Sequence, residues 1–321
     1  MRAFASPLGL QLERFLAHKR SLGLAYHREE GFLHEFDRFL ATRNDPVLCE
    51  AMTREYLSRL GDGSRLHHLT VIRQLARFLL VEESRTFVPT RRFLGIRRRR
   101  SVIRVLSRTE AGRFLDACEQ LPATSSTFAR GLVRATALRV LLLTGLRRGE
   151  VLALRDDDVD LVNGLITVRQ GKFGKSRFVP LTPDLTERLR AYRDIVAGQV
   201  AGRRPADAFF PRSDGHHPTT PKILYKSFRK VLVMAGIDHH GRGRGPRLHD
   251  LRHSFAVLRL LSWYEADADL WAKLPLLATY LGHVGLNTSQ VYLHMTRDLV
   301  GEVTRRHLAH FGDLVTAEVT S

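Results

Sequence analysis

The stretch Leu165–Leu181, LITVRQGKFGKSRFVPL, is the part of the chain with the strongest β-strand pattern. Two runs rich in β-branched and aromatic residues, 165–170 and 176–181, flank the short connection 171–175, which contains two glycines. Because glycine readily adopts the backbone conformations of tight hairpin turns, this pattern predicts an antiparallel hairpin. The sequence after it favours helices, which we expect around residues 183–197, 221–235, 247–263 and 269–281. The sequence thus predicts a mainly α protein with a small antiparallel β-sheet.

The N-terminal part of the chain has helical spacing throughout residues 8–85. Apolar side chains recur on one face in two separate stretches, which include Phe15, Phe36 and Ile72. We therefore predict an all-α bundle of four or five helices within a domain spanning residues 1–90. Several basic side chains between the apolar positions are expected to face outwards: Arg65, His67, His68, Arg73 and Arg77.

Composition and charge limit the class of protein. The chain has 321 residues, 44% of them hydrophobic, a net charge of +18 and an isoelectric point near 10.8. This length predicts two domains or one large domain with an appendage, and the hydrophobic content predicts a globular protein. The charge favours a polyanionic partner, with nucleic acid first among the alternatives. An anionic membrane surface is disfavoured because no basic amphipathic helix is evident and apolar runs such as Val140–Leu143 are far too short to span a bilayer.

The N-terminus and the cysteines bear on the cellular compartment. The first fifteen residues, MRAFASPLGLQLERF, lack the apolar stretch of a secretion signal. Cys49 and Cys118 are too few for a disulfide scaffold or a four-cysteine metal site. We therefore expect a reduced, cytoplasmic location.

Residues 91–104, RRFLGIRRRRSVIR, form an arginine-rich segment with seven arginines and no acid. Such a run of like charges repels itself and favours an extended chain. We interpret it as an interdomain linker that crosses a DNA backbone, with phosphate contacts from Arg97, Arg98, Arg99 and Arg100. A solvated linker without a role and a nuclear-localisation signal are the alternatives. The remaining residues, 105–321, form the second predicted domain.

Three short segments of this second domain contain the residues whose side chains are best suited to catalysis. They are 144–150 (TGLRRGE), 249–253 (HDLRH) and 281–283 (LGH), and Tyr292 lies nine residues after His283. Taken singly, an Arg-x-x-Glu pair is usually a surface ion pair, a histidine is usually packed or solvated, and a tyrosine is usually half buried. Their order along one chain, with Lys172 in the predicted turn, is what favours a functional site.

These segments resemble the motifs of the tyrosine recombinase (phage integrase) family over residues 105–296. The resemblance implies a helical DNA-clamping domain at the N-terminus, followed by a catalytic domain with a C-terminal tail. It implies the following site: Arg147, Lys172, His249, Arg252 and His283 around the nucleophile Tyr292, with Glu150 and His253 in support. The interval of 31 residues between Arg252 and His283 is longer than expected for Xer-type members, with the extra residues near 262–273.

The implied roles match the chemistry of the side chains. Arg147 and Arg252 would clamp the nonbridging oxygens of the scissile phosphate, since arginine stays protonated and offers a planar fork of donors. A tyrosine phenol has a pKa near 10, so its attack needs a base, and the family position of His249 implies this role. Lys172, with Lys175 as its rival, would protonate the departing 5′ oxygen, and His283 would donate a further hydrogen bond.

Other cofactor-dependent chemistries are less well supported. The carboxylates of Asp156, Asp157 and Asp158 suggest Mg²⁺, but they fall where a turn with solvated acids is expected. The pairs 216–217 and 239–240 are adjacent histidines without the spacing of zinc ligands, and no phosphate-binding Gly-x-x-x-x-Gly-Lys motif for ATP is present. We expect no metal and no nucleotide cofactor.

The sequence leaves three functions to be separated. The first is a site-specific recombinase that leaves 3′-phosphotyrosyl links, exchanges strands through a Holliday junction in a homotetramer on two DNA duplexes, and serves integration or excision of a mobile element. Its C-terminal segment after Tyr292 would dock on a neighbouring protomer. The alternatives are a type IB topoisomerase with the same active-site residues and a non-catalytic DNA-binding protein.

Overall fold

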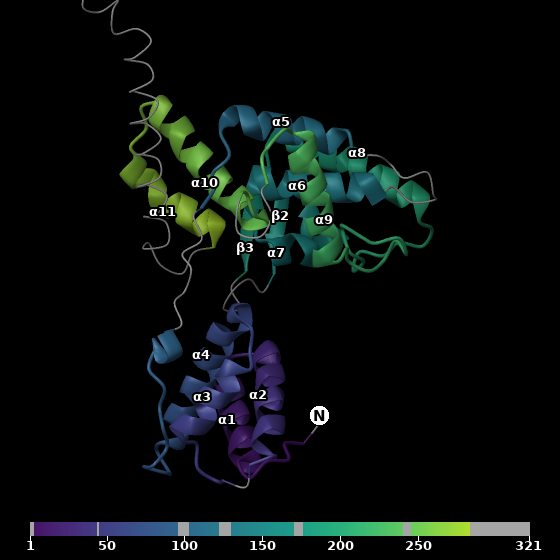
Figure 1. The fold of residues 1–321 in the computed structure, drawn as a ribbon. Coiled ribbons are helices and arrows are strands. Elements are labelled where there is room, and N and C mark those ends of the chain that lie inside the picture. Colours follow the sequence, from purple (N-terminus) through teal and green to yellow (C-terminus); the bar gives the residue numbers. More distant parts are fainter. Residues whose placement is uncertain are drawn as a thin grey trace, which may run out of the picture. The chain divides into compact units, whose positions relative to one another are not determined.

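The structure, a computed structural model, describes residues 3–43, 45–95, 103–121, 130–169, 176–239 and 245–282. The chain forms two compact units, Met1–Arg100 and Ser101–Ser321 (Figure 1). In both units the described residues are mainly helical, and the one described sheet is small and antiparallel. The predicted fold class is therefore confirmed.

The first unit is a helical bundle. Its helices are α1 (Gly9–Ser21), α2 (His27–Leu40), α3 (Glu50–Ser58) and α4 (Asp62–Leu79), followed by the short 3-10 helix η1 (Phe93–Gly95). Phe15, Phe36, Leu75 and Phe93 are buried in one common core. Phe93 thus lies in the fold of the first unit although its sequence context predicted a place in the linker, whereas Arg97, Arg98, Arg99 and Arg100 lie outside the described residues.

One basic residue of this bundle points inwards. His68 was expected to face solvent, but its side chain is buried, and this prediction is wrong. The His68 ring packs on Phe32, and its Nδ1 shares a 2.8 Å hydrogen bond with the hydroxyl of Tyr56. A partner from another helix therefore satisfies a polar ring that the helical pattern alone would leave at the surface.

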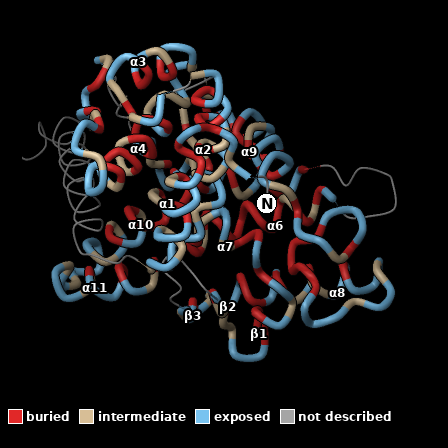
Figure 2. Tube along the Cα trace, turned by 90° about the horizontal axis from the view of Figure 1, so that it is seen from below, coloured by how far each residue is buried: buried red, intermediate tan, exposed pale blue. Residues whose placement is uncertain are grey.

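The second unit is built around helix α6 (Arg130–Thr144), which is buried along most of its length (red in Figure 2). It packs against α5 (Arg108–Glu119), α9 (Pro221–Met234) and α10 (Leu248–Glu265). A sequence that is apolar on nearly all sides, as in Val140–Leu143, is typical of such a central helix. The other helices of the unit are α7 (Arg148–Ala153), α8 (Pro183–Gln199) and α11 (Leu270–Leu281), with the 3-10 helix η2 (Asp156–Asp158) after α7.

The sheet of the second unit has three strands in the order β1 (Val159–Asp160), β2 (Leu165–Val168) and β3 (Arg177–Pro180). All pairs are antiparallel, with Ile166 opposite Val159 on one side and opposite Val179 on the other. The predicted hairpin is confirmed for β2 and β3, while its connection, which contains Lys172, lies outside the described residues. Strand β1 was not predicted because two residues are too few to show an alternating pattern.

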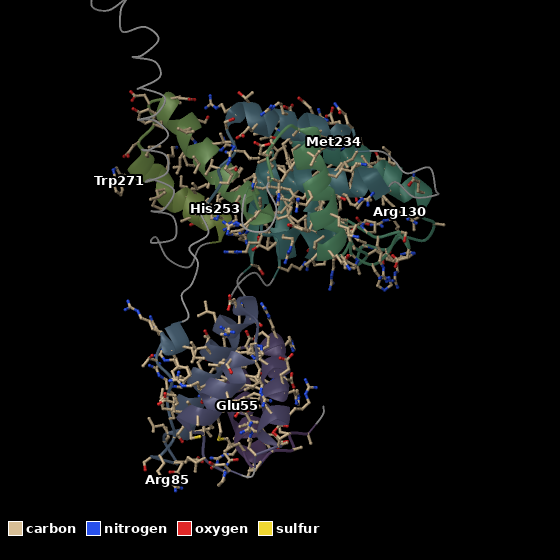
Figure 3. All side chains as sticks on the ribbon, viewed as in Figure 1. Glu55, Arg85, Arg130, Met234, His253 and Trp271 are labelled. Atoms are coloured by element: carbon tan, nitrogen blue, oxygen red, sulfur yellow. The ribbon has the colours of Figure 1, made fainter. Side chains whose placement is uncertain are left out.

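The helices predicted after the hairpin are present close to their expected bounds. Thr182 and Thr220 cap the starts of α8 and α9, and each is followed by proline, which is pre-organised for the first helical position. The long interval between Arg252 and His283 consists mainly of the second half of α10 and the whole of α11. In this α10–α11 pair, Trp271 (Figure 3) and Leu276 are exposed.

Gly145, between α6 and α7, is a position where three helices approach closely. Its φ is +62°, and a Cβ placed there would lie 2.5 Å from Cδ1 of Phe255 on α10 and 2.9 Å from Cδ2 of Leu281 on α11. Both the left-handed backbone and the lack of space therefore require glycine. The connection that leads into α7 depends on this residue.

We predict that Gly145→Ala lowers the free energy of unfolding of the second unit by about 2–4 kcal/mol, because the energetic cost of the strained backbone and that of overpacking add together. The measurement is denaturant unfolding followed by circular dichroism. Gly112→Ala in α5 is the matched control, because a Cβ placed at Gly112 would meet nothing within 4 Å. It should raise stability by about 0.5–1 kcal/mol, as expected for Ala over Gly within a helix. Equal effects of the two substitutions would contradict this account.

Candidate active site

Arg147 lies at the start of α7, where the backbone is extended before the helix begins. Its backbone N–H donates to Oε2 of Glu150 at 2.8 Å, and its Nη1 donates to Oε1 of the same carboxylate at 2.8 Å. Glu150 therefore caps the helix and holds the Arg147 guanidinium at once, which explains the Arg-x-x-Glu spacing. Its neighbour Arg148 is exposed on the first turn of α7.

Arg177 at the start of β3 is a second partner of Glu150, and the sequence did not predict it. Its Nη1 and Nη2 donate to the two carboxylate oxygens at 3.1 and 2.9 Å, a bidentate pair. The side chains of Arg177 and Glu150 are only 12% and 8% exposed. The alternation of side chains along β3 could have indicated this role. Arg177 shares a strand face with the buried Val179, and a buried arginine needs a partner for its charge.

Arg252 lies on α10 and is buried. Its Nη1 donates to the carbonyl of Gly145 at 2.8 Å and its Nη2 donates to the carbonyl of Leu281 at 2.6 Å. The structure thus places the second predicted arginine between the start of the α7 segment and the end of α11. Arg147 and Arg252, which are 105 residues apart in sequence, are brought to the same end of α11.

Three successive carbonyls at the C-terminal end of α11 each accept a hydrogen bond from a different arginine. Arg177 Nε donates to Tyr280 at 2.8 Å, Arg252 Nη2 to Leu281, and Arg147 Nη2 to Gly282 at 2.9 Å. The last carbonyls of a helix have no partner within the helix and carry partial negative charge, so cations are favoured there. We call this set of three arginines, Glu150 and the three carbonyls the arginine cluster.

Gly282 ends α11 in the left-handed conformation, with φ of +67°. A Cβ at this position would lie 2.9 to 3.2 Å from the guanidinium atoms of Arg177. Glycine is therefore needed both for the backbone conformation and for the close approach of Arg177. The next residue in the sequence is His283.

Glu150 is ionised in this setting. Burial raises the pKa of its carboxyl, but the hydrogen bonds from Arg177 and from the Arg147 backbone outweigh burial and lower the pKa to about 2, from an ordinary 4.5. With three guanidinium groups and one carboxylate, the arginine cluster keeps a net positive charge. Such a site suits an anionic ligand.

His249 and His253 lie one turn apart on α10, with ring centroids 4.7 Å apart and the rings nearly perpendicular. His249 is open to solvent, yet surrounding protein atoms partly desolvate its ring, and this, together with the charge of Arg252, lowers its pKa. Burial, followed by the neighbouring His249, lowers the pKa of His253 to about 4. Both rings are therefore neutral at pH 7, and a neutral imidazole has a nitrogen that accepts a proton.

The remaining predicted site residues, Lys172, His283 and Tyr292, lie outside the described residues. Among the six tyrosines that the structure describes, burial raises the pKa of Tyr26 and of Tyr280 to about 12. Burial also raises the pKa of Tyr56 and Tyr192 above the ordinary value. These four phenols therefore hold their protons more strongly than a free tyrosine.

The three aspartates of η2 do not form a metal site. They were expected to be solvated, but Asp158 is buried and pairs with Arg169, and Asp156 is largely buried and pairs with Arg203. The expectation of solvated acids is thus wrong for these two, because Arg169 lies just after β2, 11 residues from Asp158, and Arg203 lies 47 residues from Asp156. Across the described ranges, no cluster of three or more histidine, cysteine or acidic residues is placed to hold a metal ion.

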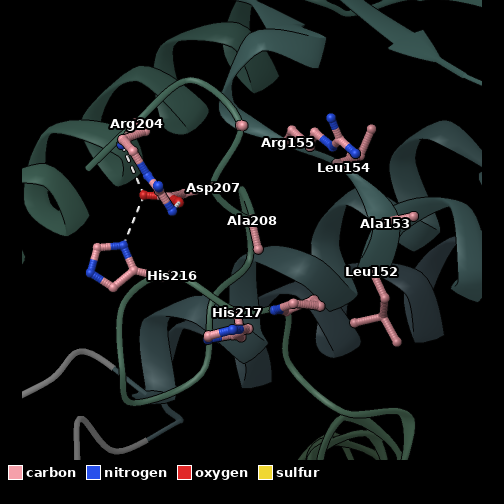
Figure 4. Close-up of a pocket in the computed structure, with 11 residues that line it drawn as sticks. Leu152, Ala153, Leu154, Arg155, Arg204, Asp207, Ala208, His216 and His217 are labelled. Atoms are coloured by element: carbon pink, nitrogen blue, oxygen red, sulfur yellow. Dashed lines mark hydrogen bonds and ion pairs between the residues drawn. The ribbon is translucent and has the colours of Figure 1, made fainter. Parts of the chain in front are cut away.

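The adjacent histidines 216 and 217 line a cavity of about 350 Å³ beside α7 (Figure 4). His216 Nδ1 lies 2.8 Å from Asp207, which also pairs with Arg204, and His217 Nδ1 lies 3.0 Å from Asp214. Each ring thus pairs with a carboxylate close to it in sequence, as the dashed lines show for His216. These contacts stabilise the loop conformation and explain why both histidines occur there.

No helix in the described part of the chain has the length and apolar character needed to cross a lipid bilayer.

Comparison with known proteins gives consistent matches. Residues 104–298 match the family described as "Phage integrase family". A Sinorhizobium fredii protein named "Putative integrase/recombinase y4rE" is 35% identical over 310 residues, covering 95% of this chain and 97% of that protein. The tyrosine recombinase XerD of Caulobacter vibrioides is 31% identical over 274 residues, covering 83% of this chain and 79% of that protein.

Solved structures with the same fold include two recombinases bound to DNA. The XerH site-specific recombinase in a post-cleavage complex with its palindromic difH substrate has a TM-score of 0.61 at 19% identity, covering 94% of this chain and 97% of that chain. A lambda integrase dimer bound to a COC′ core site has a TM-score of 0.57 at 18% identity, covering 89% of this chain and 76% of that chain. At these identities the likeness shows the shared fold.

We predict that Glu150→Gln removes a pH-dependent part of the stability. The folded-state pKa of about 2 lies below the ordinary 4.5, so the ionised carboxylate stabilises the protein above pH 4.5 and this contribution is lost as the pH falls towards 2. The difference in free energy of unfolding between wild type and Glu150→Gln should therefore be greatest above pH 4.5 and shrink below it.

The measurement is denaturant unfolding between pH 3 and 7 at constant ionic strength. Glu187→Gln is the control, since Glu187 is 71% exposed and pairs with Arg190 at the surface. This control should parallel the wild type across the range. If the difference in free energy of unfolding between wild type and Glu150→Gln stays constant with pH, the ion pairs do not lower the pKa of Glu150.

Proposed function

The chain belongs to the phage integrase family of tyrosine recombinases, enzymes that cleave and rejoin DNA, and we propose that it acts on specific DNA sites through a 3′-phosphotyrosyl intermediate. The observation that carries this proposal is the convergence of Arg147 and Arg252 at the end of α11. The sequence continues directly from this point to His283 and Tyr292.

We assign the phosphate clamp to Arg147 and Arg252. Their guanidinium groups are held in place before DNA arrives, so they stabilise the charge that grows on the nonbridging oxygens without a cost of reorganisation. Loss of one such donor commonly reduces the rate by about 10²–10³. The net positive charge of the arginine cluster supports this assignment.

The proposed strand cleavage takes one proton from Tyr292 and delivers one proton to the departing 5′ oxygen. The Tyr292 oxygen attacks the phosphorus and passes its proton to His249, whose lowered pKa leaves the imidazole neutral at pH 7. The bond from phosphorus to the 5′ oxygen breaks, and Lys172 supplies the proton to that oxygen. His283 donates a hydrogen bond to the phosphate, while His253 supports His249 from the next turn of α10.

The phosphotyrosyl bond keeps the energy of the diester, so a 5′ hydroxyl from another strand can reverse the reaction. No nucleotide is needed for rejoining, and the arginine charges act where a metal ion would otherwise stabilise the phosphate. We therefore propose that the enzyme works without metal or nucleotide cofactors.

We propose that double-stranded DNA is the partner, bound with help from Arg97, Arg98, Arg99 and Arg100. The net charge of +18 supports this, since contacts of arginine with phosphate release counterions and drive binding. Exchange through a Holliday junction requires two duplexes and four protomers, so a homotetramer on DNA follows. Similarity to an integrase/recombinase over nearly the whole of both chains supports a role in integration or excision of a mobile element.

We predict that Tyr292→Phe abolishes covalent attachment to DNA, because phenylalanine has no oxygen to attack phosphorus. The probe is a library of nicked duplexes with a randomised central region, in which cleavage releases a short strand and traps the adduct. Adducts that survive denaturation are isolated and sequenced, so the same experiment identifies the DNA site.

Tyr264→Phe is the matched control, because Tyr264 is a tyrosine of the second unit with 52% exposure. It should form the adduct at the wild-type rate, and a chelator such as EDTA should leave that rate unchanged. An adduct that persists in Tyr292→Phe would refute the assigned nucleophile. No adduct from folded wild type on any member of the library would favour a non-catalytic DNA-binding protein.

We predict that deletion of residues 305–321 abolishes cooperative assembly of two duplexes while single duplexes are still bound. The segment 299–315 contains Leu308, Phe311, Leu314 and Val315, enough apolar surface to dock on a neighbouring protomer. The measurement is a gel-shift titration with the duplex recovered above, and deletion of residues 320–321 is the control. Synapsis that is unchanged by the longer deletion would contradict the docking.

A further inference from the structure

We propose that Arg177 is a positioning residue for the strand cleavage proposed above: it holds Arg147 through Glu150 and holds the end of α11 through the carbonyl of Tyr280. The inference rests on the proposed function and adds to it a residue outside the motifs recognised in the sequence. The contacts of Arg177 join β3, α7 and α11 of the second unit.

Arg147 and Arg177 share the carboxylate of Glu150. Oε1 of Glu150 accepts from Nη1 of Arg147 and Nη1 of Arg177, while Oε2 accepts from the Arg147 backbone and from Nη2 of Arg177. Both oxygens therefore have two donors from two sides, and Glu150 cannot turn without breaking one pair. Since the carboxylate is only 8% exposed, water cannot readily replace a lost arginine.

Arg177 and Arg147 differ in exposure and in the number of donors that the protein already uses. All three side-chain nitrogens of Arg177 donate to protein acceptors, and its side chain is 12% exposed. Arg147 is 26% exposed, and its described bonds to Glu150 and Gly282 use two of its five side-chain N–H groups. Counted in the same way, the described bonds of Arg177 use three of its five N–H groups, one on each nitrogen. Arg147 is therefore the more exposed of the two and has more donors left for a phosphate, while each nitrogen of Arg177 already binds a protein acceptor.

Arg177 also contacts the end of α11. Arg177 Nε binds the Tyr280 carbonyl, and its guanidinium approaches Gly282 so closely that a Cβ there would meet it at 2.9 Å. Arg177 therefore fixes β3 to the last turn of α11, next to the two carbonyls that Arg147 and Arg252 contact. Displacement of this turn would change the orientation of both arginines at once.

The competing explanation is that Arg177 only stabilises the fold. Arg203 provides a matched comparison in the same unit, because it too is a largely buried arginine, 8% exposed, that pairs with one carboxylate and with backbone carbonyls. Its partners are Asp156, Gly215 and Ala208, none of which contacts the arginine cluster in the described structure. Replacing either arginine by lysine keeps the charge and removes the planar fork.

The experiment measures single-turnover formation of the covalent adduct on the duplex recovered from the nicked library. The variants are Arg177→Lys, Arg203→Lys, Arg147→Lys and the double variants that combine Arg147→Lys with each of the other two. Rates are determined at saturating DNA and normalised to the folded fraction from circular dichroism, and DNA affinity is measured separately by gel shift.

We expect Arg177→Lys to form the adduct more slowly by a factor on the order of 10², because a small misplacement of a clamping group has effects of this size. Its DNA affinity should stay within about twofold of wild type, since many phosphate contacts contribute to binding. Arg203→Lys should lower the melting temperature without slowing the normalised rate. In the Arg147→Lys background, Arg177→Lys should add little, because residues that act through one another are not additive.

Three results would overturn the inference while leaving the proposed function intact. One is a wild-type rate for folded Arg177→Lys, and a second is full additivity of the Arg147→Lys and Arg177→Lys effects. Equal normalised loss in Arg177→Lys and Arg203→Lys would likewise assign Arg177 a purely structural role. Absence of any adduct from wild type would instead refute the proposed function, and with it the inference that rests on it.

Discussion

The second unit depends on the binding of three arginines to three successive carbonyls at the end of α11. Arg177, Arg252 and Arg147 come from a strand, from the interior of a helix and from the start of another helix. Burying three unpaired carbonyls at this helix end would reduce the stability of the fold. Burying three unpaired guanidinium groups would reduce it further, because they are charged. Each set therefore satisfies the other, and the relative position of β3, α7, α10 and α11 follows from this pairing.

Glu150 decides whether this arrangement is stable. Three like charges around one helix end repel one another, and burial weakens the screening by water. The carboxylate accepts from two of the three guanidinium groups, which reduces this repulsion, and it also caps α7. One acidic residue thus links helix formation to the electrostatics of the arginine cluster, and its lowered pKa is the expected consequence.

The sequence predicted those features that depend on local pattern. The hairpin and the helices of the second unit follow from periodicity, and Arg147, Glu150 and Arg252 were predicted as site residues because their motifs occur in a recognisable order. Features that depend on distant partners were missed. His68 is buried because Tyr56 on another helix supplies its hydrogen bond, and Asp156 is paired because Arg203 lies across the fold. Arg177 was missed for the same reason, since its partners Glu150 and Tyr280 are distant in sequence.

Holding the arginines through backbone carbonyls has a mechanistic consequence. A carbonyl fixed by a helix cannot rotate away, whereas a side-chain acceptor can change rotamer, so the guanidinium groups are restrained before any ligand binds. A carbonyl is also neutral, and it orients an arginine without cancelling its charge as a carboxylate would. Arg252 has a carbonyl at each of two nitrogens and Arg147 has one carbonyl and one carboxylate, so the cluster remains positive. The same α11 turn that restrains the arginines leads in sequence to His283 and Tyr292, and a shift of this turn would therefore affect the proposed phosphate clamp and the proposed nucleophile together.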